Sequence, residues 1–322
     1  MKAYTHTAYG PPEVLKLNDV SDPVPGDNEV LIRIHATTVN RTDNGFLRAD
    51  PFIARFFTGL FTPKHKTPGS EFAGMVEAAG SNVSLFKTGD RVFGFSEFGA
   101  HAEYITMAEN GPLTAIPENL TYEEAAPLTE GAHYALNIIR AAKVTHGQRI
   151  LVYGATGAIG SAMVQLLKAI NTEVTAVCDT KNVDLVRSLG VDEVIDYTKE
   201  DFTGINRTFD AVFDAVGKSS FRRCKPLLKK RGIYVSTDLG FMAQNPYLAL
   251  VTPLFGGRKV LFPIPRINQE IVHYIKELAK TGKFKPVIDR RYDFEKIPDA
   301  FRYVATGQKV GNVVIVFIDI NH

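Results

Sequence analysis

The segment Leu151–Gly160 has residue types and a spacing suited to binding a phosphate group. An apolar, β-prone run, Ile150–Tyr153, leads into glycines three residues apart, and a helical apolar pattern follows. The pattern predicts a strand, a tight turn and a helix whose free N–H groups and positive dipole end suit a pyrophosphate. We expect the pyrophosphate to lie against Gly154, Ala155, Thr156, Gly157, Ala158 and Ile159.

The residues beyond this turn indicate a nicotinamide dinucleotide. Glu173–Cys178 is predicted to be the next strand, and Asp179 ends it 19 residues after Gly160. A carboxylate there can accept hydrogen bonds from both ribose hydroxyls and repel a 2′-phosphate, which favours NAD. Lys181 could instead attract that phosphate, and Tyr197 could pack on the adenosine. The alternative is that Asp179 or Thr180 only caps the following helix.

Alternating strands and helices position this turn. From Arg149 we expect strands at 149–153, 173–178, 193–196, 210–214, 232–236 and 259–262, and helices near 159–170, 182–189 and 219–229. Such alternation is typical of an α/β fold with a doubly wound parallel sheet. The preceding sequence has short strand patterns such as Val30–Ala36, Phe72–Ala78 and Arg91–Phe95, which predict a partly closed β-barrel. Helical sequence is expected over 122–143 and 269–281.

Composition narrows the class of protein. The chain has 322 residues, 45% hydrophobic and 22% charged, which suits a globular protein of two domains. The net charge of +2 gives no reason to expect a nucleic-acid partner. Cys178 and Cys224, the only cysteines, are expected to be buried thiols. Because no apolar run is long enough to span a membrane and none resembles a signal peptide, we expect a cytoplasmic protein without integral membrane contact.

Motifs along most of the chain together resemble the medium-chain dehydrogenase/reductase superfamily, in its zinc-free quinone oxidoreductase-like branch. The motifs are Val39–Asp43, Pro68–Gly74, Gly89–Gly94, Gly154–Gly160, Leu189–Asp192, Asp210–Gly217 and Gly311–Val314. The resemblance implies a GroES-like, mostly-β catalytic domain, residues 1–121 and 264–322, and a Rossmann domain, residues 122–263. It also implies a cleft between them and a homodimer paired through the edge strand near 259–262.

The motifs also bear on a metal. The zinc-dependent branch places a histidine ligand where this chain has Ser70, and often a cysteine ligand where it has Arg41 or Thr42. Catalytic zinc needs three protein ligands around an open position. We therefore expect no metal.

The resemblance assigns further residues to the site. It implies that the cofactor also contacts Ala215, Val216, Gly217, Leu239, Gly240, Phe262, Pro263, Ile264, Gly311 and Asn312. It places Asn40 and Asp43 at the cleft, with positioning roles and with Asn40 near the nicotinamide. The alternative is that these two residues only form a polar turn at the end of a strand.

Aromatic residues are the candidates for substrate contact, namely Phe46, Phe52, Phe56 and Phe95. Phe46 stands where some quinone reductases carry a tyrosine, so it offers no proton, which favours quinones over acceptors that need a positioned acid. The apolar residues at 52, 53, 56, 57 and 60 predict one helix face. That face is interpreted first as core packing, second as a cleft wall and third as a membrane-surface contact.

The expected function is a zinc-free NAD(P)H-dependent oxidoreductase that passes hydride to a small apolar quinone or similar activated carbonyl compound. The resemblance favours NADPH, while Asp179 keeps NADH open. Two alternatives are a dinucleotide-binding sensor with little turnover and a reductase of enones, which would require a proton source.

Overall fold

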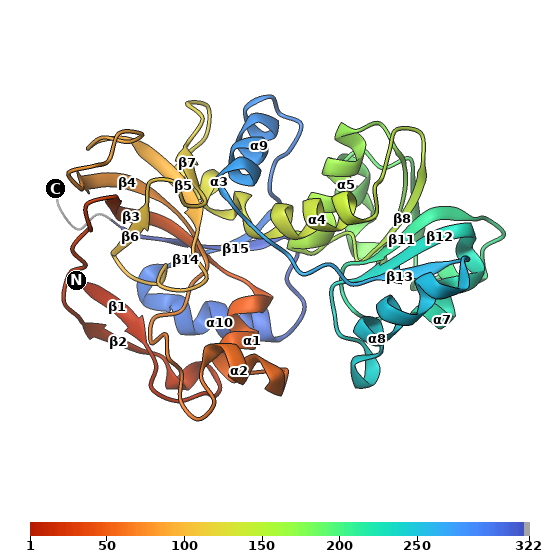
Figure 1. Ribbon diagram of the computed structural model, residues 1–322, viewed down its shortest axis with the longest axis horizontal. Helices are drawn as coiled ribbons and strands as arrows, with labels where there is room; N and C mark the ends of the chain where they lie inside the picture. The colour runs from red at the N-terminus through yellow and green to blue at the C-terminus, as the bar shows by residue number, and fades with distance from the viewer. Residues whose placement is uncertain (319–322) are drawn as a thin grey trace. The chain divides into compact units, whose positions relative to one another are not determined.

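The chain forms two compact units in a computed structural model that describes residues 1–318 (Figure 1). The first unit contains Met1–Glu130, Ile267–Thr281 and the segment from Pro286 onward. The second unit contains Gly131–Arg266 and Gly282–Lys285. Both ends of the chain therefore contribute to the first unit.

The second unit is built on a six-stranded sheet in the order β10-β9-β8-β11-β12-β13. All its neighbouring strands are parallel. Numbered within the unit, this order is that of the doubly wound dinucleotide-binding fold, with its reversal point between β8 and β11. The strands are β8 (Arg149–Tyr153), β9 (Glu173–Cys178), β10 (Glu193–Asp196), β11 (Phe209–Asp214), β12 (Leu228–Ser236) and β13 (Lys259–Leu261).

Helices connect these parallel strands and cover both faces of the sheet (Figure 1). They are α4 (Glu130–Ala141), α5 (Ala158–Ala169), η4 (Thr180–Asn182), α6 (Val183–Ser188), η5 (Phe202–Gly204), α7 (Phe221–Cys224), η6 (Lys225–Leu227), η7 (Phe241–Ala243), α8 (Gln244–Val251) and η8 (Thr252–Phe255). The core beneath them includes Leu151, Val177, Val212, Tyr234 and Val260. The predicted α/β fold is confirmed.

The first unit is mostly β. Its seven-stranded sheet runs β14-β15-β3-β4-β5-β7, and β6 also pairs with β3. The first half of the long strand β3 pairs with β6, and its second half pairs with β15. The sheet strands are β3 (Glu29–Val39), β4 (Glu71–Ala79), β5 (Arg91–Phe95), β6 (Tyr104–Ala108), β7 (Leu113–Ala115), β14 (Ile288–Asp293) and β15 (Asn312–Val316).

The remaining elements of this unit surround the sheet. They are β1 (Lys2–Thr5), β2 (Lys16–Asp19), η1 (Pro12–Val14), α1 (Arg41–Arg48), η2 (Phe52–Ala54), α2 (Arg55–Thr58), α3 (Tyr122–Ala125), η3 (Ala126–Leu128), α9 (Gln269–Lys280), η9 (Phe294–Lys296) and α10 (Ile297–Ala305). One core cluster includes Ile32, Phe72 and Val92, and another includes Leu47 and Phe301. None of the helices within residues 1–318 is long and apolar enough to cross a bilayer.

Three helix predictions need correction. The helix expected over 122–143 is interrupted at Pro127, whose ψ of 15° is not helical. The helix expected over 219–229 ends early, because strand β12 already begins at Leu228 and carries Lys230 and Arg231 at exposed positions. The apolar face of residues 52–60 lies on two very short helices and is exposed, so its interpretation as core packing is wrong.

Cys178 and Cys224 are both buried and free, as predicted.

Candidate functional site

The turn between β8 and α5 depends on close backbone contacts at two of its glycines. Gly154 has a φ of 82°, and a side chain there would meet Val216 at 2.4 Å. A Cβ on Gly160 would lie 2.1 Å from the carbonyl oxygen of Gly154, so the first turn of α5 packs directly on the preceding loop. Both positions therefore require glycine for structural reasons.

Gly157 differs from these two glycines. It is the N-cap residue of α5 with φ at −73°, a backbone conformation open to any residue, and a Cβ there would meet no atom within 4 Å. No side chain among residues 1–318 caps the helix, and Thr156–Ile159 are partly accessible. The turn thus leaves open space at the positive end of a 12-residue helix. These features fit the pyrophosphate of a dinucleotide.

Asp179 lies at the carboxyl end of β9, as the ribose acid of such a site should. Its side chain does not cap η4; its Oδ1 accepts a hydrogen bond from the Asn182 amide at 2.5 Å. The Thr180 hydroxyl donates to Asp196 at 2.5 Å, and hydrogen bonds from Thr180 and Thr198 lower the pKa of Asp196 to about 2. This edge of the site therefore carries negative charge, and the exposed Lys181 stands beside it.

The loop after β11 is held by a buried carboxylate. Asp214 accepts hydrogen bonds from the backbone N–H groups of Val216 and Gly217 at Oδ1 and of Ser219 at Oδ2, all within 3.1 Å. The Tyr234 hydroxyl also donates to it at 3.3 Å. Burial raises the pKa of the Asp214 carboxyl. The predicted segment Ala215–Gly217 is thus fixed at the carboxyl end of the sheet, where dinucleotides bind in this fold.

A pocket of about 180 Å³ in the same unit contains three more of the predicted residues. Phe262, Pro263 and Ile264 line it together with Ser236 and Thr237, which end β12 and follow it. Gly240 lies nearby in sequence with a φ of 73°, and its N–H donates to Asp238. Leu239 accepts a hydrogen bond from the backbone of Asn245.

In the first unit, β3 and α1 meet at a buried polar cap. Asn40, the N-cap residue of α1, donates its backbone N–H to Asp43 Oδ2 at 2.7 Å. Both residues are only 2% exposed. Asp43 therefore stabilises the start of a helix, which agrees with the structural alternative for this pair. The Asn40 amide donates to Thr38 and to Glu71, so it belongs to a larger network.

Glu71 is the centre of that network. Its Oε1 accepts from the Thr38 hydroxyl at 2.8 Å and from the Asn40 amide at 3.0 Å. Its Oε2 accepts from the Thr129 hydroxyl at 2.7 Å and from the backbone N–H groups of Thr129 and Glu130 at 3.1 and 2.7 Å. One fully buried side chain therefore ties the end of β3 to the segment that leads into α4.

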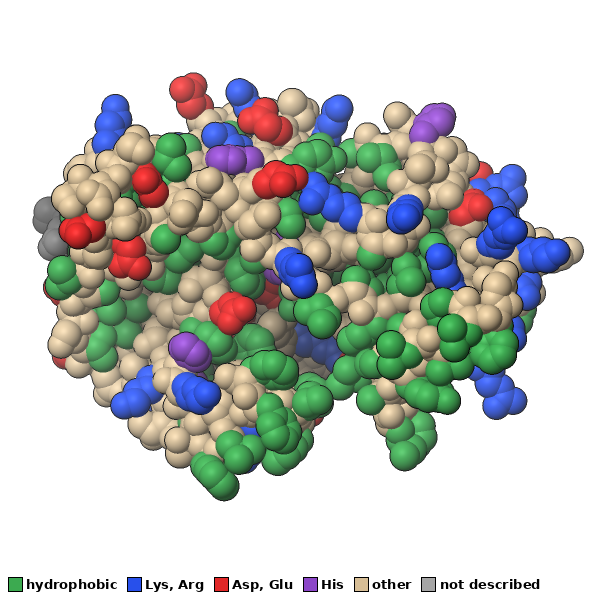
Figure 2. Space-filling view, viewed as in Figure 1, with side chains coloured by type: hydrophobic (Ala, Val, Ile, Leu, Met, Phe, Trp, Pro, Cys, Tyr) green, Lys and Arg blue, Asp and Glu red, His purple; other side chains and the backbone are tan. Residues whose placement is uncertain are grey.

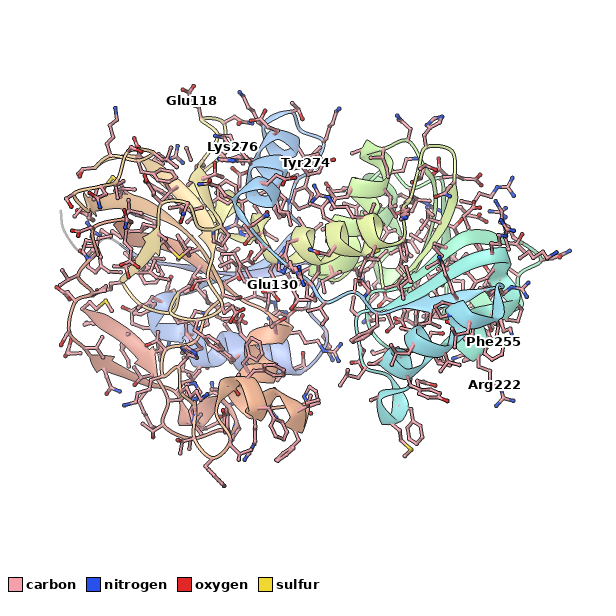
Figure 3. All side chains as sticks on the ribbon, in the orientation of Figure 1. Glu118, Glu130, Arg222, Phe255, Tyr274 and Lys276 are labelled. Atoms are coloured by element: carbon pink, nitrogen blue, oxygen red, sulfur yellow. The ribbon has the colours of Figure 1, made fainter. Side chains whose placement is uncertain are left out.

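The three buried carboxyls of Asp43, Glu71 and Glu130 influence one another (Figure 3 labels Glu130). Burial, followed by repulsion from Glu130, raises the pKa of Glu71 to about 7 and that of Asp43 well above its usual range. Burial also raises the pKa of Glu130, although a hydrogen bond from Thr42 and the charge of Lys309 oppose the rise. Burial and mutual repulsion therefore raise the pKa of these carboxyl groups, while the hydrogen bonds that they accept oppose the rise.

Sequence reasoning did not single out Glu71 and Glu130. Glu71 was visible within the Pro68–Gly74 motif, next to Ser70, and the hydroxyl of Ser70 donates to Glu130 at 3.2 Å. Nothing in the spacing links Glu130 to that motif, because the two lie 60 residues apart.

Gly311 and Asn312 have structural contacts of their own. Gly311 has a φ of 65°, and a Cβ there would lie 2.2 Å from the carbonyl oxygen of Val287. Asn312 is buried and donates its side-chain amide to the same oxygen at 3.0 Å. This pair joins the start of β15 to the residue before β14.

The four predicted substrate residues lie in different surroundings. Phe46 is partly buried and contacts Phe98, with ring centroids 5.3 Å apart, and Phe95 ends β5. Phe52 and Phe56 are exposed and pack edge to face against each other at 6.4 Å.

Comparison with known proteins identifies the family. Residues 26–118 match the alcohol dehydrogenase GroES-like domain, and residues 189–315 match a family described as zinc-binding dehydrogenase. The 2-methylene-furan-3-one reductase of Solanum lycopersicum is 35% identical over 98% of this chain and 79% of its own length. The chain belongs to the medium-chain dehydrogenase/reductase superfamily. Quinone-oxidoreductase QR1 of Triphysaria versicolor, 31% identical over 98% of both chains, supports the quinone oxidoreductase-like branch of that superfamily.

A solved structure agrees with this placement. The quinone oxidoreductase from Coxiella burnetii has a TM-score of 0.87 and 28% identity, covering 98% of this chain and 99% of that one. Like its relatives in the medium-chain superfamily, this protein is an oxidoreductase.

The family that matches residues 189–315 is described as zinc-binding. Within residues 1–318, no group of three or more His, Cys, Asp or Glu side chains could hold a metal ion. The position expected for a histidine ligand is Ser70, which is buried against Glu130. Ser70 therefore supplies no histidine ligand at this position, and a zinc-free site is still a prediction.

Proposed function

We propose that this medium-chain reductase oxidises NADPH and reduces small quinones, or conjugated carbonyl compounds of similar reactivity, without zinc. The observation that carries the proposal is the open, uncapped N-terminus of α5 at Gly157. A bound nicotinamide supplies the hydride. The chain holds and orients the cofactor through that turn and through the Ala215–Gly217 loop, which Asp214 fixes.

The preference for NADPH rests on charge beside the ribose. Asn182 engages one oxygen of Asp179, and Lys181 presents an exposed ammonium group two residues along the chain. A relative from Arabidopsis thaliana, 31% identical over 98% of this chain, is named an NADPH-dependent alkenal/one oxidoreductase. Asp179 still repels a 2′-phosphate, so the preference is expected to be modest.

The preference for quinones rests on Phe46, which offers no proton at its position, and on the names of the quinone oxidoreductase relatives. A reduced quinone is a stabilised anion that water can protonate, whereas a reduced enone gains more from a positioned acid. The names of other relatives refer to an alkenal/one and a furanone, so enones belong in the same test.

The test is the oxidation of NADPH and of NADH, followed by absorbance, with quinones, enones and aldehydes as acceptors. We expect quinone-dependent turnover that is faster with NADPH. Tight cofactor binding without turnover on any acceptor would contradict the proposal and favour a sensor. Faster turnover on enones than on quinones would show that the acceptor class is wrong.

We also propose a homodimer formed through the free edge of β13, the last strand in its sheet. Apolar side chains of α8 and η8 that pack near this strand are widely exposed, namely Tyr247, Leu250, Leu254 and Phe255 (Figure 3 labels Phe255). An edge strand with apolar neighbours is a ready surface for pairing. Light scattering should give twice the chain mass, and the paired change Leu254→Ser/Phe255→Ser should give the mass of one chain.

A cytoplasmic location is still a prediction, since QR1 is named chloroplastic.

A further inference from the structure

The segment Phe52–Phe61 places six large apolar side chains on the surface of the first unit. They are Phe52, Ile53, Phe56, Phe57, Leu60 and Phe61, with exposures from 44% to 85%. We call them the Phe52–Phe61 patch. Monomeric proteins rarely expose so many neighbouring apolar side chains without an interaction that uses them.

The patch is exposed because its polar and backbone groups are fixed on the opposite side. The Tyr9 hydroxyl donates to the carbonyl oxygen of Gly59 at 2.7 Å and lies 2.8 Å from the hydroxyl oxygen of the buried Thr58. The backbone N–H of Lys64 donates to the carbonyl oxygen of Thr58 at 2.8 Å. The guanidinium of Arg55 lies over the Tyr9 ring at 4.9 Å. These contacts hold the loop in place and leave its phenylalanines outside.

The charges in and beside the patch are mostly basic. Between Arg48 and Lys66 the chain carries Arg48, Arg55, Lys64 and Lys66 against one acidic residue, the exposed Asp50, whereas the net charge of the whole chain is only +2. Lys64, His65 and Lys66 are exposed. Figure 2 shows apolar side chains gathered over α2, with basic side chains beside them. The surface therefore combines an apolar centre with a basic margin.

We propose that the Phe52–Phe61 patch docks the protein on an anionic lipid bilayer. Aromatic side chains enter the boundary between head groups and acyl chains, while lysines attract anionic head groups, and reversible binding needs both contributions. A small apolar substrate would cover only part of six side chains. A second copy of the chain is the weaker occupant, because the patch offers no strand edge and identical basic margins would repel each other. This docking goes beyond the proposed reaction and does not depend on it.

The first test is sedimentation of the full chain with vesicles of phosphatidylcholine alone, or mixed equally with phosphatidylglycerol. We expect binding to the anionic vesicles that weakens as salt rises. Phe57→Ser/Phe61→Ser should weaken binding about tenfold or more, since each buried phenylalanine contributes strongly to transfer from water. Lys64→Gln/Lys66→Gln should remove the preference for anionic vesicles. The matched control, Val24→Ser/Leu85→Ser, removes two exposed apolar side chains of the same unit outside the patch and should bind as the parent does.

A second measurement does not depend on disruptive substitutions. The chain contains no tryptophan, so Phe61→Trp introduces one fluorophore into the patch. Its emission should shift to shorter wavelength when anionic vesicles are added, whereas that of Phe255→Trp should not. Failure of the unmodified protein to bind anionic vesicles would overturn the proposal. So would an unchanged Phe61→Trp spectrum, or a change in oligomer mass instead of vesicle binding in Phe57→Ser/Phe61→Ser.

Discussion

Substitution by alanine should have different effects at two glycines of the turn between β8 and α5. Gly157→Ala places a methyl group in open space at the N-terminus of α5, with the backbone in an ordinary conformation. Gly160→Ala places it 2.1 Å from the carbonyl oxygen of Gly154. The first change should therefore affect ligand binding, and the second should affect folding.

The magnitudes follow from these contacts. At Gly157, reduced freedom of the unfolded chain contributes about 0.4–1 kcal/mol, and a poorer helix cap costs a similar amount, so stability changes little. A methyl group that keeps a pyrophosphate away from the helix N–H groups removes about 1.5–3 kcal/mol of charged hydrogen bonding. That loss raises the dissociation constant about 10- to 150-fold. At Gly160, overpacking costs about 1–3 kcal/mol of unfolding free energy.

Thermal unfolding and fluorescence titration with NADPH separate the two effects. Gly157→Ala should unfold at nearly the parent temperature and bind NADPH weakly. Gly160→Ala should unfold lower, by about 2–4 °C for each kcal/mol lost. If Gly157→Ala bound NADPH as tightly as the parent, the turn would not be the phosphate site, and the proposed function would lose its main support.

Three further predictions concern buried or charged carboxylates. Stability should fall as pH rises from about 4.5 to about 7, because burial raises the pKa of Glu71 from 4.5 to about 7 and the unfolded chain releases the proton first. The unfolding temperature of Glu71→Gln should depend less on pH, because an amide does not titrate in this range. At low pH this variant should unfold at a lower temperature than the parent, since its amide nitrogen would face two backbone N–H donors. Asp179→Ser should raise the NADPH-to-NADH ratio of kcat/KM about tenfold by removing a charge that repels the 2′-phosphate; an unchanged ratio would place the ribose elsewhere. Asp214→Asn should cost about 1–3 kcal/mol in a denaturant titration and weaken NADPH binding, because Ser219 N–H loses its acceptor; parent-like stability would contradict this.

Much of the second unit was predictable because its local signals agree with its fold. The strands at 149–153, 173–178 and 193–196 have β-prone residues at their centres and are followed by glycine, aspartate or tyrosine, and the structure gives them the same bounds. The prediction of a helix over 219–229 was wrong because the first residues of β12 include Lys229, Lys230 and Arg231, which do not look like a strand in the sequence. Charged residues at exposed strand positions carry no alternating apolar signal.

The candidate site was predictable only where one segment builds it. The glycine turn is local, so its spacing was sufficient. The carboxyl cluster joins α1, β4 and the start of α4, and no spacing rule connects Glu71 to Glu130. The prediction that the apolar face of residues 52–60 packs in the core was wrong for a related reason. Helical spacing shows that apolar residues share a face, but only the tertiary structure shows what that face contacts.

The pairing of β3 with β15 has a consequence for synthesis of the chain. Val39 pairs with Val313 and Ala36 with Val316. This part of β3 can therefore complete its pairing only after the last part of the chain has been synthesised. The second unit is nearly continuous in sequence, and it can fold while β3 still has a free edge. A nascent chain stalled before Asn312 would therefore have a finished second unit and an unpaired β3 edge at Ala36–Val39, a form suited to chaperone binding or aggregation.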